Sequence, residues 1–140
     1  MWQYKTSVAW KGGKEGELNS AGKPPIIVAT PPEFGGPPGQ WTPEDFLTNA
    51  VAGCLMTSAL YYFGRAKLDI RAYTCNAVGT MDKGPTGLVF TGVEAKLRIT
   101  AASPDQVEGI RQAVGKAEKS CPISNTLNCP VTVDLEVDSA

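Results

Sequence analysis

Residues 42–54 read TPEDFLTNAVAGC, and this stretch predicts the start of a long helix. Thr42 is a suitable N-cap residue, and Pro43 suits the first helical position. The acidic residues that follow favour the positive end of the helix dipole. Apolar residues then recur at spacings of three to four as far as about Phe63, which predicts one continuous apolar face. Because few charges fall within residues 45–65, we expect this helix to be buried nearly all round, between a sheet and a partner subunit.

Strand-like segments lie on both sides of this helix. The predicted elements are strands at 4–10, 17–19 and 25–30, an irregular proline- and glycine-rich loop at 31–40, paired strands at 69–81 and 87–100 around a turn at 82–86, a helix capped by Ser103 with Gln106 completing a capping box, a short helix from Pro122, and a strand at 131–137. An irregularity is expected near Gly92. This order predicts a single α+β domain over residues 1–140 with a mostly antiparallel sheet.

The composition argues against several classes of function. The formal net charge is −1 and there is no basic run, so a nucleic-acid partner has little electrostatic support. The N-terminus shows no signal peptide, and no run of 18 apolar residues indicates a membrane span. We therefore expect a soluble cytoplasmic protein with reduced thiols and no membrane partner. Because the chain has no histidine, a zinc site with histidine ligands is impossible, and we expect neither a metal nor a bound cofactor.

Two of the four cysteines stand in distinctive settings. Cys54 lies about eleven residues into the predicted helix, where apolar surroundings would raise the pKa of its thiol. Cys121 directly precedes Pro122, where the free amides of a short helix would stabilise a thiolate. Both have a structural alternative, because a mid-helix cysteine is commonly core and Cys-Pro commonly marks a helix junction. Cys75 and Cys129 have no activating pattern and are predicted to be structural.

Glu44 also has two interpretations. Alone, it would stabilise the helix dipole. It precedes Cys54 by ten residues, or roughly 15 Å along a helix, so the two cannot touch within one straight helix. If both serve one site, Glu44 of a second subunit must reach Cys54, which an antiparallel pairing of these helices across a two-fold axis would allow.

Taken together, three segments resemble a known family. These are PEDFL at 43–47, A-x-x-GC at 50–54 and AEK-x-CPISN at 117–125. They are similar to motifs of the OsmC/Ohr family, the osmotically inducible protein C and organic hydroperoxide resistance proteins, and the resemblance covers nearly the whole chain. It implies an intertwined homodimer of α+β subunits, with two long central helices between sheets and active sites at the subunit interface.

The resemblance also implies a reaction. By motif position, Cys54 corresponds to the peroxidatic cysteine, Cys121 to the resolving cysteine and Glu44 to the site glutamate. The first cysteine would be oxidised to a sulfenic acid by an organic hydroperoxide, and the second would convert it to a disulfide before irreversible overoxidation. An external thiol, often protein-bound dihydrolipoamide, would reduce that disulfide. The implied activity is a cysteine-based peroxidase of the oxidative stress response.

The chain departs from the Ohr branch at one site position. That branch has an arginine after a Gly-Gly pair, whereas here Gly12-Gly13 precedes Lys14. Lysine supplies positive charge without the planar fork that binds a carboxylate at two points. Lys14 is therefore a candidate site residue, with a solvated turn lysine as its alternative, and an OsmC-like subgroup is favoured over a true Ohr protein. Phe34 and Trp41 would form an apolar wall beside the peroxide or serve in ordinary packing.

Two further interpretations stay open. A non-enzymatic OsmC-like protein would keep the fold and the dimer but bind a small apolar ligand or sense redox state. An unrelated α+β domain with incidental cysteines would place Cys54 and Cys121 too far apart to bridge, with a Cα separation well above about 7 Å.

Overall fold

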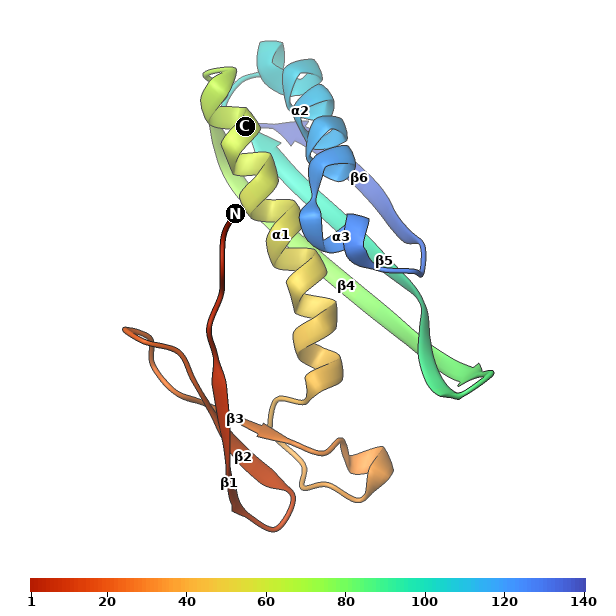
Figure 1. The fold of residues 1–140 in the computed structure, drawn as a ribbon. Helices are drawn as coiled ribbons and strands as arrows, with labels where there is room; N and C mark the ends of the chain where they lie inside the picture. Colours follow the sequence, from red (N-terminus) through yellow and green to blue (C-terminus); the bar gives the residue numbers. More distant parts are fainter. The chain divides into compact units, whose positions relative to one another are not determined.

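A computed structural model describes residues 1–140, which form two compact units, Met1–Leu47 and Thr48–Ala140. Figure 1 shows the helices and strands, which confirm the predicted α+β class. The strands are β1 (Ser7–Gly12), β2 (Glu15–Asn19), β3 (Ile26–Ala29), β4 (Ile70–Gly84), β5 (Gly87–Ala101) and β6 (Val131–Ser139), and the α-helices are α1 (Pro43–Arg65), α2 (Val107–Ser120) and α3 (Pro122–Thr126). That the whole chain is one domain stays a prediction.

The first unit contains an antiparallel sheet in the order β1-β2-β3. The turn between β1 and β2 uses Gly12 and Gly13, whose φ angles of 111° and 53° are readily adopted by glycine. Strand β1 begins later than the predicted segment 4–10. The loop after β3 was predicted to be irregular throughout, but it contains a 3-10 turn at Pro32–Phe34. Proline is compatible with that turn because its fixed φ suits a first helical position.

Helix α1 begins as predicted, with a reciprocal cap. Thr42 Oγ1 accepts a hydrogen bond from the Asp45 amide at 3.1 Å. The Asp45 carboxylate in turn accepts from the Thr42 amide at 3.0 Å and from its hydroxyl at 2.9 Å. These bonds satisfy donors that the first helical turn leaves without partners. The helix then runs without a break to Arg65, so residues 44 and 54 do share one helix.

Within a single chain, α1 is buried on one side only, and its burial on the other side by a partner subunit stays a prediction. Its buried residues are Val51, Ala52, Leu55, Ala59 and Phe63. In contrast, Met56, Leu60 and Tyr61 are 38%, 45% and 57% exposed, and their spacing places them on one side of the helix. The difference arises because this chain covers only the sheet-facing side of α1.

By length and composition alone, α1 is also long and apolar enough to cross a membrane. The sequence did not indicate this, because α1 contains no unbroken run of 18 apolar residues. This is weak evidence, because the core helix of a soluble protein passes the same test.

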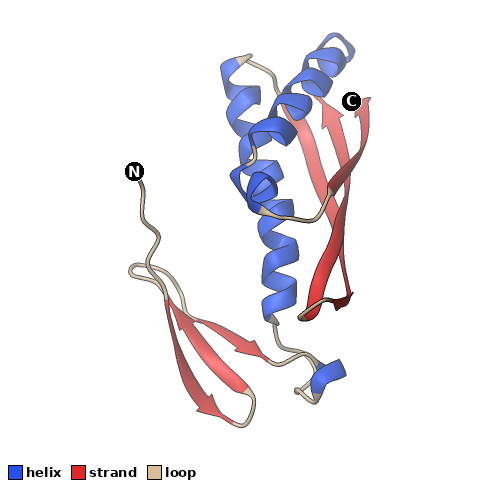
Figure 2. Ribbon diagram, turned by 45° about the vertical axis from the view of Figure 1, so that its right-hand side comes forward, coloured by secondary structure: helices blue, strands red, loops and turns tan.

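The second unit contains a sheet in the order β4-β5-β6. Strands β4 and β5 are antiparallel, and their turn is shorter than predicted because they extend to Gly84 and Gly87. The irregularity expected near Gly92 is present as a register shift opposite Thr80 and Met81. Strand β6 pairs with β5 in parallel. Figure 2 shows the helices on one face of this sheet, where alternate residues of β5 are buried: Val93, Ala95, Leu97, Ile99 and Ala101.

The start of α2 differs from its predicted form. A 3-10 turn at Pro104–Gln106 precedes the helix, and Ser103 forms no side-chain cap. Gln106 does not complete a capping box. Its Nε2 donates to Ser103 Oγ at 3.0 Å, and its Oε1 accepts from the Asp69 amide at 2.7 Å. Gln106 therefore ties the start of α2 to the connection between α1 and β4. The short helix predicted at Pro122 is confirmed.

Gly79 of β4 allows the close approach of α1. A Cβ atom at this position would overlap Thr48 Oγ1 and would lie 2.8 Å from Phe90 Cε1. Because both side chains would have to move, we expect Gly79→Ala to reduce the free energy of unfolding by about 1–3 kcal/mol, as measured by chemical denaturation. Gly115→Ala is the control, since its Cβ would meet nothing within 4 Å and alanine is the better helix former. Equal midpoints for the two variants would contradict this account of the α1–β4 contact.

Candidate functional site

The second unit brings Cys54 and Cys121 together. Cys54 lies on α1 and Cys121 lies between α2 and α3, and the two thiols lie close enough for each to shift the pKa of the other. Both are free thiols. Cys121 is completely buried, with 0% of its surface exposed, whereas Cys54 is half-buried. The alternative of an unrelated domain predicted that the two cysteines lie far apart, and their proximity argues against it. Cys54 is the more accessible of the two sulfurs.

Cys121 is the N-cap residue of α3, and its sulfur accepts hydrogen bonds there. Ser124 donates to Cys121 Sγ from its amide at 3.5 Å and from its hydroxyl at 3.3 Å. Burial by itself acts to raise the pKa of the Cys121 thiol. The hydrogen bonds from Ser124, Cys54 and the Ile123 amide outweigh that effect, so the pKa lies below its ordinary value. The direction is the one predicted from the position of Cys121 before Pro122.

The pKa of the Cys54 thiol is shifted in the opposite direction from that of Cys121. Burial and the hydrogen bond to Cys121 raise the pKa of the Cys54 thiol. Two groups oppose this rise without reversing it, the Ile123 backbone and the Ser58 hydroxyl. Ser58 Oγ lies 3.8 Å from Cys54 Sγ. In the reduced protein, the more acidic sulfur is therefore Cys121.

Sequence reasoning missed Ser58 and Ser124 as neighbours of the two sulfurs. Ser58 follows Cys54 by four residues on one helix, and this spacing brings side chains together. Ser124 follows the N-cap residue by three residues, and the amide at that position points back to the cap. Both spacings were available in the sequence, but an N-cap cysteine is not among the usual capping residues.

The first unit brings Lys14 and Glu44 to one hollow of about 720 Å³. Lys14 is exposed, and its Nζ donates to the Phe34 carbonyl at 3.5 Å. The apolar side chains on the hollow are Val8, Trp10, Val28, Ala29, Pro31, Phe34 and Pro43. The expectation of a wall at Phe34 agrees with this lining. Trp41 is not part of it and stacks instead on Phe46, with ring centroids 6.0 Å apart.

The four predicted site residues thus form two pairs, one in each unit. Lys14 and Glu44 line the hollow of residues 1–47, and Cys54 and Cys121 are neighbours that shift each other's pKa within residues 48–140. That all four act in one site stays a prediction. No group of three or more cysteine, aspartate or glutamate side chains is arranged to hold a metal ion.

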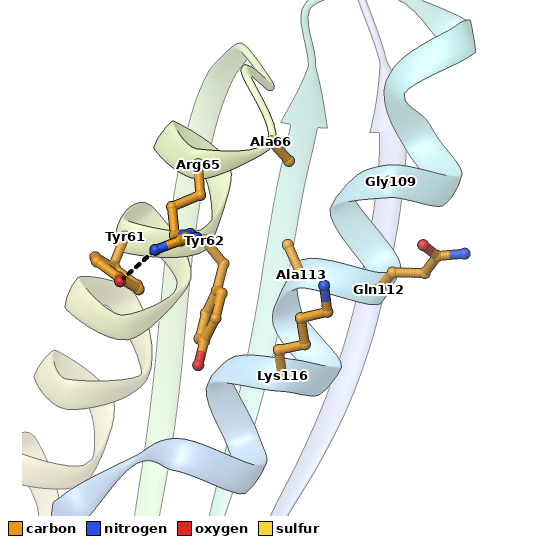
Figure 3. Close-up of a pocket in the computed structure, with 8 residues that line it drawn as sticks. All are labelled: Tyr61, Tyr62, Arg65, Ala66, Gly109, Gln112, Ala113 and Lys116. Carbon is orange, nitrogen blue, oxygen red and sulfur yellow. Dashed lines mark hydrogen bonds between the residues drawn. The ribbon is translucent and has the colours of Figure 1, made fainter.

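A further hollow of about 570 Å³ lies between α1 and α2 (Figure 3). Arg65 turns toward Tyr61 and donates to its hydroxyl at 3.1 Å, and Tyr62 points between the two helices. The Tyr62 hydroxyl donates to Ser120 Oγ at 3.1 Å, one residue before Cys121. The lining contains Arg65 and Lys116 but no thiol or carboxylate, so this hollow lacks a nucleophile of its own.

The chain is similar to known proteins in sequence and in fold. The model of the OsmC-like protein family matches residues 36–136. No curated protein matches. Among solved structures, an OsmC-like protein of unknown function from Vibrio cholerae is 19% identical, with a TM-score of 0.84, covering 98% of this chain and 99% of that one.

Two other solved structures carry a more specific description. An organic hydroperoxide resistance protein OsmC from Legionella pneumophila is 24% identical, with a TM-score of 0.74 and 99% and 98% coverage. An organic hydroperoxide resistance protein from Elizabethkingia anophelis is 20% identical, with a TM-score of 0.74 and 100% and 98% coverage. At these identities the structures show the fold alone, whereas the family model covers most of the sequence. The chain therefore belongs to the OsmC-like protein family.

Proposed function

We propose that this protein is a cysteine-based peroxidase that reduces organic hydroperoxides. The observation that carries the proposal is the proximity of the Cys54 and Cys121 thiols, each of which shifts the pKa of the other, within an OsmC-like fold. Some structurally similar proteins are described as organic hydroperoxide resistance proteins, which is consistent with this chemistry. The half-buried Cys54 is the attacking residue, and the fully buried Cys121 is the resolving residue.

The proposed cycle uses the two electrons of the thiol pair. The Cys54 thiol gives up its proton and its sulfur attacks the outer oxygen of the hydroperoxide, the O–O bond breaks, and the alkoxide takes a proton and leaves as an alcohol. Cys54 is then a sulfenic acid. The Cys121 thiolate attacks that sulfur, an S–S bond forms, and the hydroxide released is protonated to water. A dithiol reductant regenerates both thiols by disulfide exchange and is itself oxidised.

The hollow that Lys14 and Glu44 line supplies further candidates for the proposed site. Its apolar side chains suit the organic group of a hydroperoxide, and the Lys14 ammonium suits an anion that forms as the peroxide is reduced. Lys14 and Glu44 are therefore proposed as site residues that accompany the thiol pair. The family arrangement, with sites at a subunit interface, is the proposed way in which these residues reach it.

A homodimer is part of the same proposal. The exposed face of α1 carries Met56, Leu60 and Tyr61, and β1 exposes Val8 and Trp10 at 65% and 78%. Apolar side chains gathered on an element in this way are typical of interaction surfaces. We expect sedimentation equilibrium to give twice the mass of the chain. A fully active monomer would contradict the shared-site arrangement.

The physiological setting follows from the same proposal. The protein is expected to act in the cytoplasm, where an external thiol such as a lipoylated protein reduces the disulfide. Neither nucleic acid nor a membrane is proposed as a partner.

Reaction with cumene hydroperoxide tests the proposed function. One equivalent of peroxide should remove two of the four thiols, and peptide mapping should find them joined as a Cys54–Cys121 disulfide. We expect the rate constant to exceed that of free cysteine by orders of magnitude. The Cys75→Ala, Cys129→Ala double variant should show the same loss of two thiols. Oxidation no faster than that of free cysteine would contradict the peroxidase.

A non-enzymatic role is the second candidate, and one observation favours it. Burial and Cys121 raise the pKa of the Cys54 thiol, which makes it a slow nucleophile unless other groups activate it. The hollow of the first unit would then hold a small apolar ligand, or the thiol pair would sense redox state. In that case peroxide would oxidise the protein slowly, and ligand binding would persist in Cys54→Ser.

A further inference from the structure

We propose that Ser124 is a positioning residue that holds Cys121 as a thiolate for the step in which Cys121 resolves the oxidised Cys54. The inference rests on the proposed peroxidase function and adds a residue to it. Its starting point is geometric, because Ser124 directs two donors at one buried sulfur, its hydroxyl at 3.3 Å and its amide at 3.5 Å.

The contribution of Ser124 does not depend on the state of Cys54. In the reduced protein, Ser124 and the neighbouring Cys54 thiol both lower the pKa of Cys121. Oxidation of Cys54 to a sulfenic acid replaces its S–H with an S–O–H group and so changes the Cys54 contribution. The Ser124 hydroxyl and amide are unaffected by that oxidation. A buried thiolate without donors would be protonated, because burial disfavours the charged form.

The groups around the two sulfurs are mostly neutral. Helix α1 contributes Ser58, and α3 contributes Ser124 and the Ile123 amide. The nearest charged residues in sequence are Glu118 and Lys119 of α2, and neither is among the groups that shift either thiol. The state of Cys121 therefore depends mainly on hydrogen bonds, and loss of the Ser124 hydroxyl has no charged substitute.

The step itself is balanced with the groups present. The Cys121 thiolate supplies the electron pair of the new S–S bond, and the S–O bond of the Cys54 sulfenic acid breaks. The hydroxide that leaves takes a proton from solvent and becomes water. Slower resolution leaves the sulfenic acid open to a second peroxide, which would oxidise it to a sulfinic acid. Ser124 thus sets how much enzyme is lost to overoxidation.

The expected size of the effect follows from two opposing terms. Removing one hydrogen bond to a charged group lowers the thiolate population about tenfold at pH values below the pKa. A thiolate of higher pKa is more nucleophilic, with a Brønsted coefficient near 0.5, which returns about threefold. Ser124→Ala should therefore slow resolution about threefold at low pH. At high pH, where Cys121 is ionised in both proteins, the variant should be faster than the wild type because its thiolate is more nucleophilic.

Stopped-flow mixing with cumene hydroperoxide from pH 5 to pH 9 separates the two steps, because only the first depends on peroxide concentration. We expect the pH profiles of the second step in wild type and Ser124→Ala to cross, and Ser124→Thr to restore the wild-type profile. A defect that is only structural would slow the second step equally at every pH. That result, or no change at any pH, would overturn the inference.

Thr126→Val is the matched control, because the Thr126 hydroxyl belongs to the same short helix but donates to the Pro122 carbonyl at 2.7 Å and not to sulfur. Thr126→Val should leave the pH profile of the second step unchanged. If the profile of this variant also crossed that of the wild type, the inference would be overturned.

A second measurement separates this inference from the proposed function. Titration of the 13C-labelled cysteine Cβ resonances in the reduced protein needs no peroxide. Ser124→Ala should move the titration of Cys121 to higher pH, and Thr126→Val should not. If this shift occurs in a protein that peroxide does not oxidise, the contact of Ser124 with the thiolate stands and the peroxidase falls. If the titration does not move, the inference falls whatever the activity.

Discussion

Cys54→Ser is expected to reduce peroxide turnover by at least about 10³-fold, to the level of the uncatalysed reaction. Serine has nearly the shape of cysteine, but its hydroxyl is neither ionised at neutral pH nor oxidised by a hydroperoxide. Cys121 remains in this variant, but it is completely buried and cannot meet the substrate. Consumption of cumene hydroperoxide with dithiothreitol as reductant measures the loss.

Cys75→Ser is the control for this variant. Cys75 is half-buried on β4, and burial is the one cause that shifts the pKa of its thiol, so it has no neighbouring cysteine to resolve a sulfenic acid. We expect this variant to retain wild-type turnover. Substantial activity in Cys54→Ser, or its loss in Cys75→Ser, would mean that the attacking cysteine is not Cys54.

Gly36→Ala is expected to have the largest effect on the stability of the first unit. A Cβ atom there would overlap the Thr30 carbonyl oxygen and would lie 3.0 Å from the Pro31 carbonyl oxygen. The Gly36 amide also donates to the Pro31 carbonyl at 3.0 Å, so the backbone is held where the new atom cannot fit. Because backbone cannot move aside as a flexible side chain can, we expect a loss of about 3 kcal/mol or more.

Urea denaturation followed by the fluorescence of Trp2, Trp10 and Trp41 measures this loss, because all three lie in the first unit. Gly64→Ala is the control, since its Cβ would meet nothing within 4 Å. It should unfold at the wild-type urea concentration or above it. A Gly36→Ala variant with the wild-type midpoint would show that the loop after β3 can adopt another path without cost.

The long helix and the thiol pair show how much of the fold and site could be predicted. The start of α1 followed from Thr42 and Pro43, because capping depends on residues adjacent in the chain. The helix at Pro122 and the lowered pKa of Cys121 followed from one Cys-Pro pair for the same local reason. The OsmC-like assignment followed from the segments around both cysteines, and the family model confirms it.

Where predictions failed, the deciding contact came from elsewhere in the chain. Gln106 was expected to cap α2, but its Oε1 accepts from Asp69, 37 residues away. Trp41 stacks on Phe46, so it takes the packing role that was the alternative to a wall with Phe34. One face of α1 is exposed in the single chain, and its burial by a partner subunit stays a prediction. Each outcome depends on which segments lie next to each other in the folded protein. The spacing of residues along one segment does not carry that information.

By itself, the sequence determined the starts of α1 and α3, the strand order and the presence of two cysteines in segments that resemble the family, because these depend on spacing along the chain. Only the tertiary structure decided that α1 and the start of α3 bring the two thiols close enough for each to shift the pKa of the other. The physical reason is that a thiol pKa is the sum of burial, which raises it, and hydrogen bonds, which lower it. Packing determines the first, and the second depends on donors such as Ser124 and Cys54 that converge on one sulfur.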